Sequence, residues 1–319
     1  MGVYKSIMGS LFGVDTDLGP MFNGQPISAM PRGFGRDFYV DSVTGNAGST
    51  GKGPDNAVTT IALAVAKCRA NKGDRVIVME GHSETVSAAT ALGVAGVTII
   101  GLGQGRSRPL VTFDTANTSG YTIAVDNVRF FNIRFAANFL SIAAAFTLTT
   151  AKGFRLDGCR FFDTSAILNF LNIVKSTGAA NTVDGLHIEN TTWNGLGTTS
   201  VNSFVLTAND IDNLVLVGNT VKLDRTATAA ILATVTAGVL TDLRCEDNVA
   251  ISKATATTGG GLISVGGTTS TGIVKRNYQQ TLGTGTDILF TTTVGLAAFE
   301  NRVSGVIGAQ GFVIPAADS

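Results

Sequence analysis

The chain has 319 residues, of which 39 are Gly, and only 14% are charged, with 23 Lys and Arg against 23 Asp and Glu. So much Gly disfavours a mostly helical protein, and the balanced charge lacks the basic field of a general nucleic-acid binder. No apolar run is long enough to cross a membrane, and the first 14 residues lack the pattern of a signal peptide. The 44% of hydrophobic residues suffices for a core, which excludes general disorder.

Residues 1–36 are expected to form an extended N-terminal arm. Gly and Pro are scattered among isolated apolar residues such as Phe12, Met21 and Phe22, and no helical or strand period persists. The segment is either a floppy terminus or an arm that orders against a neighbouring subunit or another protein. In the second case these three side chains are interface residues.

Residues 37–96 are expected to hold a first strand, a capping helix and the first coil. Residues 37–51 predict a short strand and a polar loop, and from Asp55 to Asn71 apolar residues recur every three or four positions, which predicts a helix. Gly73 and Asp74 end this helix, and strands are expected at 75–79 and 96–101.

Residues 97–315 contain a repeated unit, with 316–319 as a tail. Each unit is a short alternating strand that runs into Asn or Gly, followed by further short strands without helical patterns between them, which excludes βαβ folds. Four Asn residues at intervals of 29 mark the period, and the aligned strands begin at Val128, Phe154, Leu186, Leu214, Leu243, Ile273 and Ala298. Coils stacked at ~4.8 Å would pair each strand with its copies, so the prediction is an all-β, right-handed, single-stranded parallel β-helix with an N-terminal capping helix. The Asn residues of the period are Asn190, Asn219, Asn248 and Asn277.

The segment around the predicted helix resembles the start of the pectate-lyase-like right-handed parallel β-helix superfamily. In that superfamily a strand ending in Val-Asp is often followed by a Gly/Asn loop, a cap helix containing Thr-Ile, a Gly-Asp strand start and a Gly-His turn. The resemblance implies the architecture over residues 37–315 and says little about activity. The matching dipeptides are Val40-Asp41, Gly45-Asn46, Thr60-Ile61, Gly73-Asp74 and Gly81-His82.

One carboxylate pair is the candidate for chemistry. If strands alternate inward and outward, Asp157 and Glu189 face outward on adjacent coils beside Arg155 and His187. Two carboxylates this near could cleave a glycosidic bond or act as acid and base. The alternative, favoured here, is ordinary cross-strand charge pairing that stabilises a sheet.

Other catalytic or cofactor signals are missing from the sequence. The Asp cluster and paired Arg of pectate lyases and the Asp motifs of polygalacturonases are absent, and the aromatics are mostly Phe, which suits an internal stack better than a sugar-binding groove. Trp193 and Tyr278 are interpreted as core or turn residues. The histidines and cysteines lack metal-ligand spacing, so no catalytic, cofactor or metal site is predicted.

The remaining feature of the sequence is a set of apolar residues expected on the surface. Val215, Val217 and Val274 are expected to face outward, which is most simply a contact with another copy or a partner. The description resembles non-catalytic β-helix proteins of phage particles. The resulting hypothesis is a structural virion protein of a bacteriophage, a homotrimeric capsid decoration (cement) or minor capsid protein, assembled in the host cytoplasm. Its partners would be itself and the major capsid protein or another virion protein, without direct nucleic-acid or membrane contact. The alternatives are a phage tailspike or receptor-binding protein, or a polysaccharide-degrading β-helix enzyme.

Overall fold

The computed structural model describes residues 35–197, 203–224, 230–252, 261–267, 269–281 and 295–304. It also gives the backbone of two short antiparallel strands near the N-terminus, β1 (Met21–Phe22) and β2 (Gln25–Pro26), and of β31 (Gly311–Phe312), which pairs antiparallel with β30. The expected interface residue Phe12, the side chains of Met21 and Phe22, and the tail 316–319 lie outside the described residues. In the described part no helix is long and apolar enough to cross a membrane.

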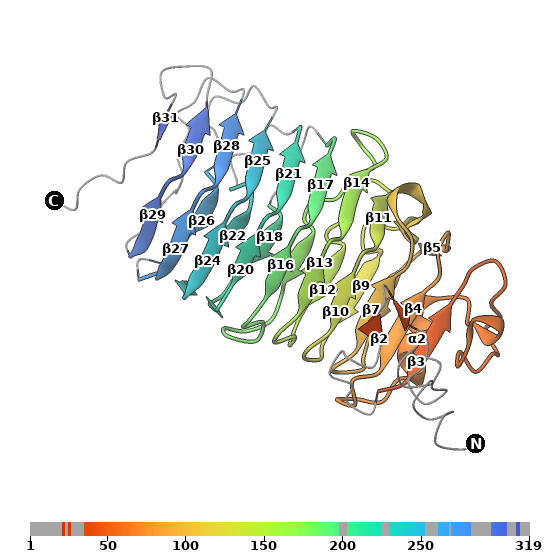
Figure 1. Cartoon of the computed structure of the whole chain (residues 1–319). Helices are drawn as coiled ribbons and strands as arrows, with labels where there is room; N and C mark the ends of the chain where they lie inside the picture. Colours follow the sequence, from red (N-terminus) through yellow and green to blue (C-terminus); the bar gives the residue numbers. More distant parts are fainter. Residues whose placement is uncertain are drawn as a thin grey trace.

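Three long sheets run along the molecule and build a parallel β-helix, as predicted (Figure 1). Strands of successive coils pair in parallel with their copies, apart from the terminal antiparallel pairing of β31 with β30. The first sheet contains β3 (Asp37–Val40), β4 (Arg75–Val78), β7 (Thr98–Gly101), β10 (Arg129–Phe131), β13 (Arg155–Asp157), β16 (His187–Glu189), β20 (Val215–Val217), β24 (Leu243–Glu246), β27 (Gly272–Lys275) and β29 (Leu296–Phe299).

The second sheet follows the first along each coil, and the third sheet closes the coil. The second contains β5 (Ser83–Val86), β8 (Leu110–Phe113), β11 (Arg134–Ala137), β14 (Arg160–Asp163), β17 (Thr192–Gly195), β21 (Thr220–Leu223), β25 (Val249–Ser252), β28 (Tyr278–Thr281), β30 (Arg302–Ser304) and β31. The third contains β6 (Ala89–Ala91), β9 (Gly120–Ile123), β12 (Phe146–Leu148), β15 (Val174–Ser176), β18 (Val205–Thr207), β22 (Ala233–Val235) and β26 (Ile263–Val265), and a small sheet pairs β19 (Ile211–Asp212) with β23 (Leu240–Thr241).

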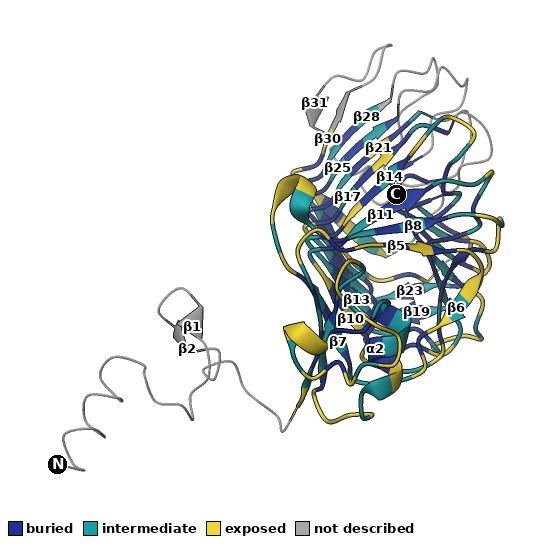
Figure 2. Cartoon of the chain, turned by 90° about the vertical axis from the view of Figure 1, so that its right-hand side faces the viewer, coloured by how far each residue is buried: buried dark blue, intermediate teal, exposed yellow. Residues whose placement is uncertain are grey.

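The core lies inside the coils because the side chains of a strand alternate between its two faces. Buried residues gather within the ring of strands in Figure 2. Phe rings stack there as predicted: the ring centroids of Phe135 and Phe161, on adjacent coils, lie 4.9 Å apart and nearly parallel, and Phe146 lies 4.9 Å from Phe130. Trp193 is also buried, at 1% exposure, which confirms its interpretation as a core residue.

The turn from the first to the second sheet has two residues in every described coil from β10 onward. The first of the two has a left-handed backbone with positive φ, and the second points into the molecule. Gly, Asn and Asp tolerate the left-handed region best, and they hold most of these first positions. The residues are Asn132, Gly158, Asn190, Gly218, Asp247, Arg276 and Glu300.

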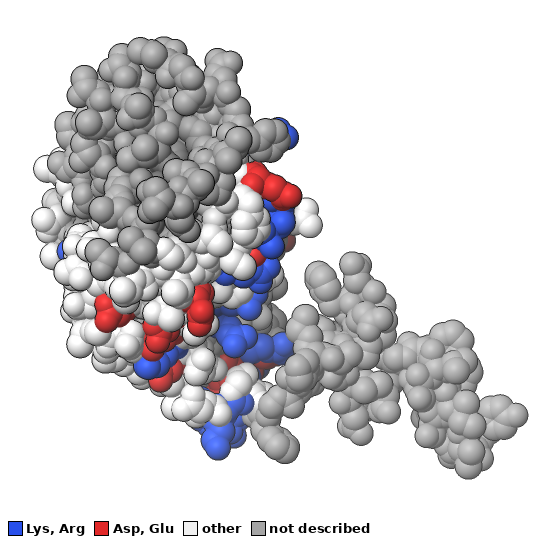
Figure 3. Space-filling model, turned by 90° about the vertical axis from the view of Figure 1, so that its left-hand side faces the viewer, with Lys and Arg blue, Asp and Glu red and all other residues white. Residues whose placement is uncertain are grey.

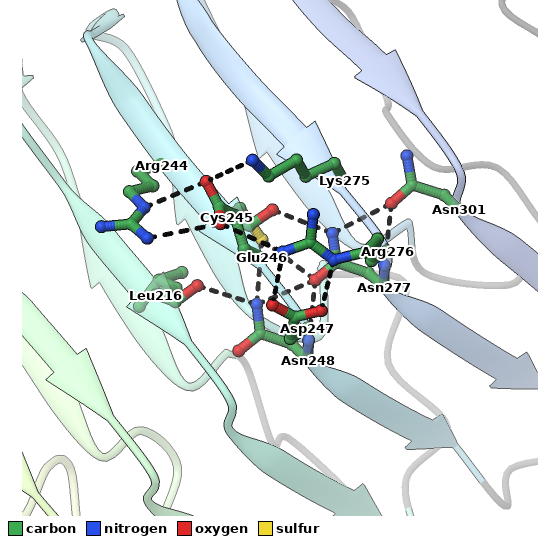
Figure 4. Close-up of polar contacts among 10 residues, drawn as sticks. All are labelled: Leu216, Arg244, Cys245, Glu246, Asp247, Asn248, Lys275, Arg276, Asn277 and Asn301. Carbon is green, nitrogen blue, oxygen red and sulfur yellow. Dashed lines mark hydrogen bonds and ion pairs between the residues drawn. The ribbon is translucent and has the colours of Figure 1, made fainter.

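The second turn position carries a buried ladder of Asn side chains (Figure 4). The Oδ1 of Asn248 accepts hydrogen bonds from the backbone N and the Nδ2 of Asn219, at 2.9 and 3.0 Å, and Asn277 does the same for Asn248. Asn301 ends the ladder with the same pair of bonds to Asn277, both 3.0 Å. Turn amides therefore satisfy one another inside the buried core.

The predicted interval of 29 residues does not lead to the ladder position at Asn190, the first Asn of the series. Thr191, and not Asn190, occupies the ladder position, where its backbone N donates to Asn219 Oδ1 at 3.0 Å. Asn190 sits one residue earlier, in the left-handed position, and is exposed. Asn301, which falls outside the spacing of 29, belongs to the ladder because the last described coil is shorter.

A helix caps the N-terminal end of the solenoid, but it is shorter than predicted. α2 runs over Ile61–Lys67, where Thr60 Oγ1 accepts a hydrogen bond from Leu63 N, and residues 54–56 form the 3-10 helix η2 (Pro54–Asn56) instead. Residues 57–60 are extended or bent, because Val58 forms a bridge with Val40 of β3. α2 packs against β3 and β4 and buries Ile61, Ala64 and Val65.

Candidate functional site

The outward face of the first sheet carries the predicted carboxylate pair. Parallel pairing of β13 with β16 places Arg155 opposite His187 and Asp157 opposite Glu189. The strand register therefore confirms that these four side chains share one outward surface on adjacent coils. Val215 and Val217 continue it on β20 and are half-buried.

Val274 was predicted on this outward surface, and that prediction is wrong. β27 begins at Gly272, so Ile273 pairs with Arg244 and Val274 pairs with the core residue Cys245. Val274 is accordingly 0% exposed, whereas Ile273 is 41% exposed. A shift of one residue turns every side chain of a strand to the other face. The correct register of β27 against β24 follows from the interval of 29 residues between Asn248 and Asn277, because the paired residues Arg244 and Ile273 are separated by the same interval.

Basic groups bind the carboxylate pair closely. The Arg155 guanidinium forms an ion pair with Glu189 Oε1 and lies 3.6 Å from Asp157 Oδ2. His187 Nε2 lies 3.1 Å from Glu189 Oε2, and Asp157 and Glu189 also hydrogen-bond each other. Glu189 therefore has three partners, the side chains of Arg155, His187 and Asp157. Asp157 has fewer charged groups around it.

The surroundings change the pKa values of the two carboxyl groups in opposite directions. Burial, together with the hydrogen bond to Glu189 and its charge, raises the pKa of Asp157 to about 6. Burial also opposes ionisation of Glu189, but the hydrogen bond from Asp157 and the Arg155 guanidinium lower the pKa of Glu189 overall. Desolvation and the charge of Arg155 lower the pKa of His187, so its imidazole is neutral at pH 7.

A second ion-pair cluster lies further along the same face (Figure 4). Arg244 Nε and Lys275 Nζ lie 3.0 and 3.3 Å from Glu246 Oε1, and Arg276 pairs with Glu246 at 3.5 Å and with Asp247 at 2.7 Å. The hydrogen bond from Arg244 is the main cause that lowers the pKa of Glu246. The charged side chains of this cluster therefore form a network of ion pairs.

This arrangement limits the chemistry open to the pair. Glycosidases place their two carboxyl groups at least ~5 Å apart, on either side of the scissile bond. Asp157 and Glu189 face each other across paired strands and share a hydrogen bond, which is a closer arrangement than that of a glycosidase pair. What the pair offers is a shared proton with an apparent pKa in the mildly acidic range.

The described residues contain no group of three or more His, Cys, Asp or Glu side chains arranged to hold a metal ion. His82 is buried, with its Nε2 3.2 Å from Glu84 Oε2, and Glu84 in turn accepts from Ile61 N at 2.9 Å and from the Tyr121 hydroxyl at 2.5 Å. That group ties the cap helix to the first coils. Burial raises the pKa of the Cys68 and Cys159 thiols to about 12, so they are inert thiols.

A pocket on the second sheet was missed in the sequence. It has a volume of about 380 Å³ and lies around the outward side chains of β11, β14 and β17. The available signal was an Arg at the start of two successive strands, Arg134 and Arg160, but only the register places them opposite each other. The lining residues are Gly105, Arg106, Arg134, Arg160, Phe161, Phe162, Thr192 and Asn194.

Comparison with known proteins found two distant likenesses among solved structures. No protein-family model matches the chain, and no curated protein matches it in sequence. A solved rhamnogalacturonan lyase is 12% identical with a TM-score of 0.46, and the match covers 88% of this chain and 90% of that one. A GH136 lacto-N-biosidase from Eubacterium ramulus is 9% identical with a TM-score of 0.40, over 85% of this chain and 68% of that one. The parallel β-helix is established by the strand pairing of the chain itself, and no function follows from these two likenesses.

Proposed function

We propose that the chain is a structural protein of a bacteriophage particle, a capsid decoration (cement) or minor capsid protein that acts through protein contacts and not as an enzyme. The observation that supports this is the state of the first sheet's outward face. Its carboxylates, Asp157, Glu189 and Glu246, are bound to basic neighbours of the same face. Carboxylates that are ion-paired in this way stabilise a rigid surface and are not available as a catalytic pair.

Exposed apolar side chains on the same face supply a contact surface for the proposed assembly. Phe131, Ile273 and Phe299 are 46%, 41% and 42% exposed, on β10, β27 and β29. They flank the charged clusters, an arrangement that resembles an interface with apolar and polar parts. The proposed contact is with copies of the chain in a homotrimer and with the major capsid protein, with the arm 1–36 gripping a neighbour.

Fractionation of phage particles, followed by cryo-EM of the heads, tests the location. We expect the protein on heads in threefold-related copies, and its presence on tails alone would contradict the head role. Removal of residues 1–34 leaves in place β3 and the residue before it, Arg36, whose backbone N donates a hydrogen bond to Asp74 Oδ1. The shortened chain should keep its circular dichroism spectrum and lose binding to heads, and full occupancy on heads would refute the arm's role.

One observation favours a second candidate, a polysaccharide-degrading enzyme. The pKa of Asp157 is raised to about 6 beside Glu189, a pattern that general acids share. Incubation with host capsule, lipopolysaccharide and pectin, with assays for reducing ends and unsaturated uronates, tests it. Activity that is lost in Asp157→Asn and Glu189→Gln but kept in Glu246→Gln would establish this candidate over the structural one.

A further inference from the structure

The pocket on the second sheet brings together basic groups from three coils. Arg134 on β11 and Arg160 on β14 are paired neighbours, so their outward side chains start one strand spacing apart. Arg106 reaches the same hollow from the 3-10 helix η3 (Gly105–Ser107). Figure 3 shows Lys and Arg side chains along one side of the molecule, with Asp and Glu side chains next to several of them.

The surroundings hold the Arg134 side chain in place without neutralising the three guanidinium groups. Arg134 Nη1 donates to the carbonyl oxygen of Arg106 at 2.7 Å, and its guanidinium lies 5.6 Å from the ring centroid of Phe162. Among the described residues, neither Arg106, Arg134 nor Arg160 forms an ion pair with a carboxylate. Asp163, on the same strand as Arg160, points inward and accepts hydrogen bonds from the backbone N of Phe170 and Leu196.

Like charges at this spacing repel one another. Desolvation and then the charges of Arg160, Arg106 and Arg108 lower the pKa of Arg134. On the first sheet, by contrast, Arg155, Arg244 and Arg276 each have a carboxylate beside them. The second sheet therefore carries an unfavourable interaction that a bound anion would offset.

We propose that this pocket binds a phosphate or sulfate ester group. Guanidinium groups recognise oxyanions with paired N–H donors, and three of them suit a tetrahedral group with several exposed oxygens better than a single carboxylate. The Thr192 hydroxyl and the Asn194 amide add polar donors, and Phe162 offers an apolar face to the group that carries the ester. The volume of about 380 Å³ lies in the ~300–1,000 Å³ range of small-ligand sites.

Titration calorimetry of the full chain with dextran sulfate, and with neutral dextran as the blank polymer, tests the site. Loss of a hydrogen bond to a charged group costs about 1.5–3 kcal/mol, so Arg134→Gln and Arg160→Gln should each weaken binding about tenfold or more. Arg129→Gln is the matched control, since it removes the same charge from an exposed position on the first sheet. Circular dichroism checks that each variant is folded.

Two further probes sharpen the result. Binding of inorganic phosphate that the double variant loses would assign a free oxyanion, whereas binding of dextran sulfate alone would assign an ester on a larger molecule. Polygalacturonate, a carboxylate polymer, should bind at least tenfold more weakly. Equal binding of polygalacturonate, equal weakening by Arg129→Gln, or no binding of any anion would overturn the proposal.

Discussion

The two residues of each turn between the first and second sheets meet different physical demands. The first must adopt a left-handed backbone, and the second must satisfy buried amides. Asn serves both purposes, because its short side chain tolerates the left-handed region and its amide both donates and accepts. Asn190 and Asn248 therefore share a residue type and a period in the sequence but have different roles in the structure.

Replacement of a ladder residue tests this distinction. Asn248→Ala removes the acceptor of two Asn219 donors inside the core, so we expect a loss of about 2–4 kcal/mol in unfolding free energy. Asn190→Gly is the control, since Gly adopts the left-handed backbone freely, and it should change stability by less than about 0.5 kcal/mol. Urea denaturation followed by circular dichroism measures both, and equal losses would argue against the ladder.

Asp157 gives a prediction on pH. Its pKa is about 6 in the folded protein and ~3.9 in an unfolded chain, so folding favours the protonated form. The contribution is fully present below pH ~4 and is lost as pH rises through 6. Asp157→Asn cannot ionise, and its stability relative to the wild type should therefore rise between pH 4 and pH 7.5, by on the order of 1 kcal/mol after solvent screening.

Melting temperatures at several pH values measure this difference. Asp55→Asn, the same change at an exposed position of η2, is measured alongside as the control. A difference between Asp157→Asn and the wild type that stays constant from pH 4 to pH 7.5 would show that the raised pKa of Asp157 does not exist.

Single strands were readable in the sequence because a strand's alternation depends only on its own residues. The carboxylate pair on β13 and β16 follows from that alternation together with the repeat. β27 shows the limit: its residues Gly-Ile-Val-Lys hold two adjacent apolar side chains, so the pattern alone does not say which one is buried. Pairing with β24 decides, since Val274 meets Cys245 in the core.

Charge substitution on β27 checks the register. Val274→Asp would bury an unpaired carboxylate, so we expect a loss of several kcal/mol or a failure to fold. Ile273→Asp is its matched neighbour, and because that side chain is exposed it should fold with a change of about 1 kcal/mol or less. Soluble yield and melting temperature compare the two, and the reverse order of stability would restore the register first expected from the sequence.

At the scale of the molecule, the sequence predicted the solenoid from its period and composition, because those features are repeated many times. The arginine pocket could not be predicted in the same way. It needs Arg106 from a loop and Arg134 and Arg160 from two strands, and only the actual coil lengths bring the three together. Coil lengths depend on the longer turns, which carry no repeated pattern.

A solenoid also exposes its ends, and α2 covers the N-terminal one. Val65→Asp places a charge on the buried face of this helix, so we expect the helix to detach and the open coil edge to pair with other chains. Ala66→Asp, one residue further on the exposed face, is the control. Light scattering after size-exclusion chromatography should detect larger species only for Val65→Asp, and identical profiles would argue against a protective cap.

The constant two-residue turn has a consequence for how such a molecule changes in evolution. Arg129 pairs with Arg155 one coil later, and Arg155 pairs with His187 after a longer coil, yet both coils keep the same turn between the first and second sheets. From β10 onward, the described differences in coil length therefore lie at the other corners of the coil, while this corner keeps successive strands aligned. New loops can be gained coil by coil, and a lineage can acquire new binding surfaces without redesigning its core.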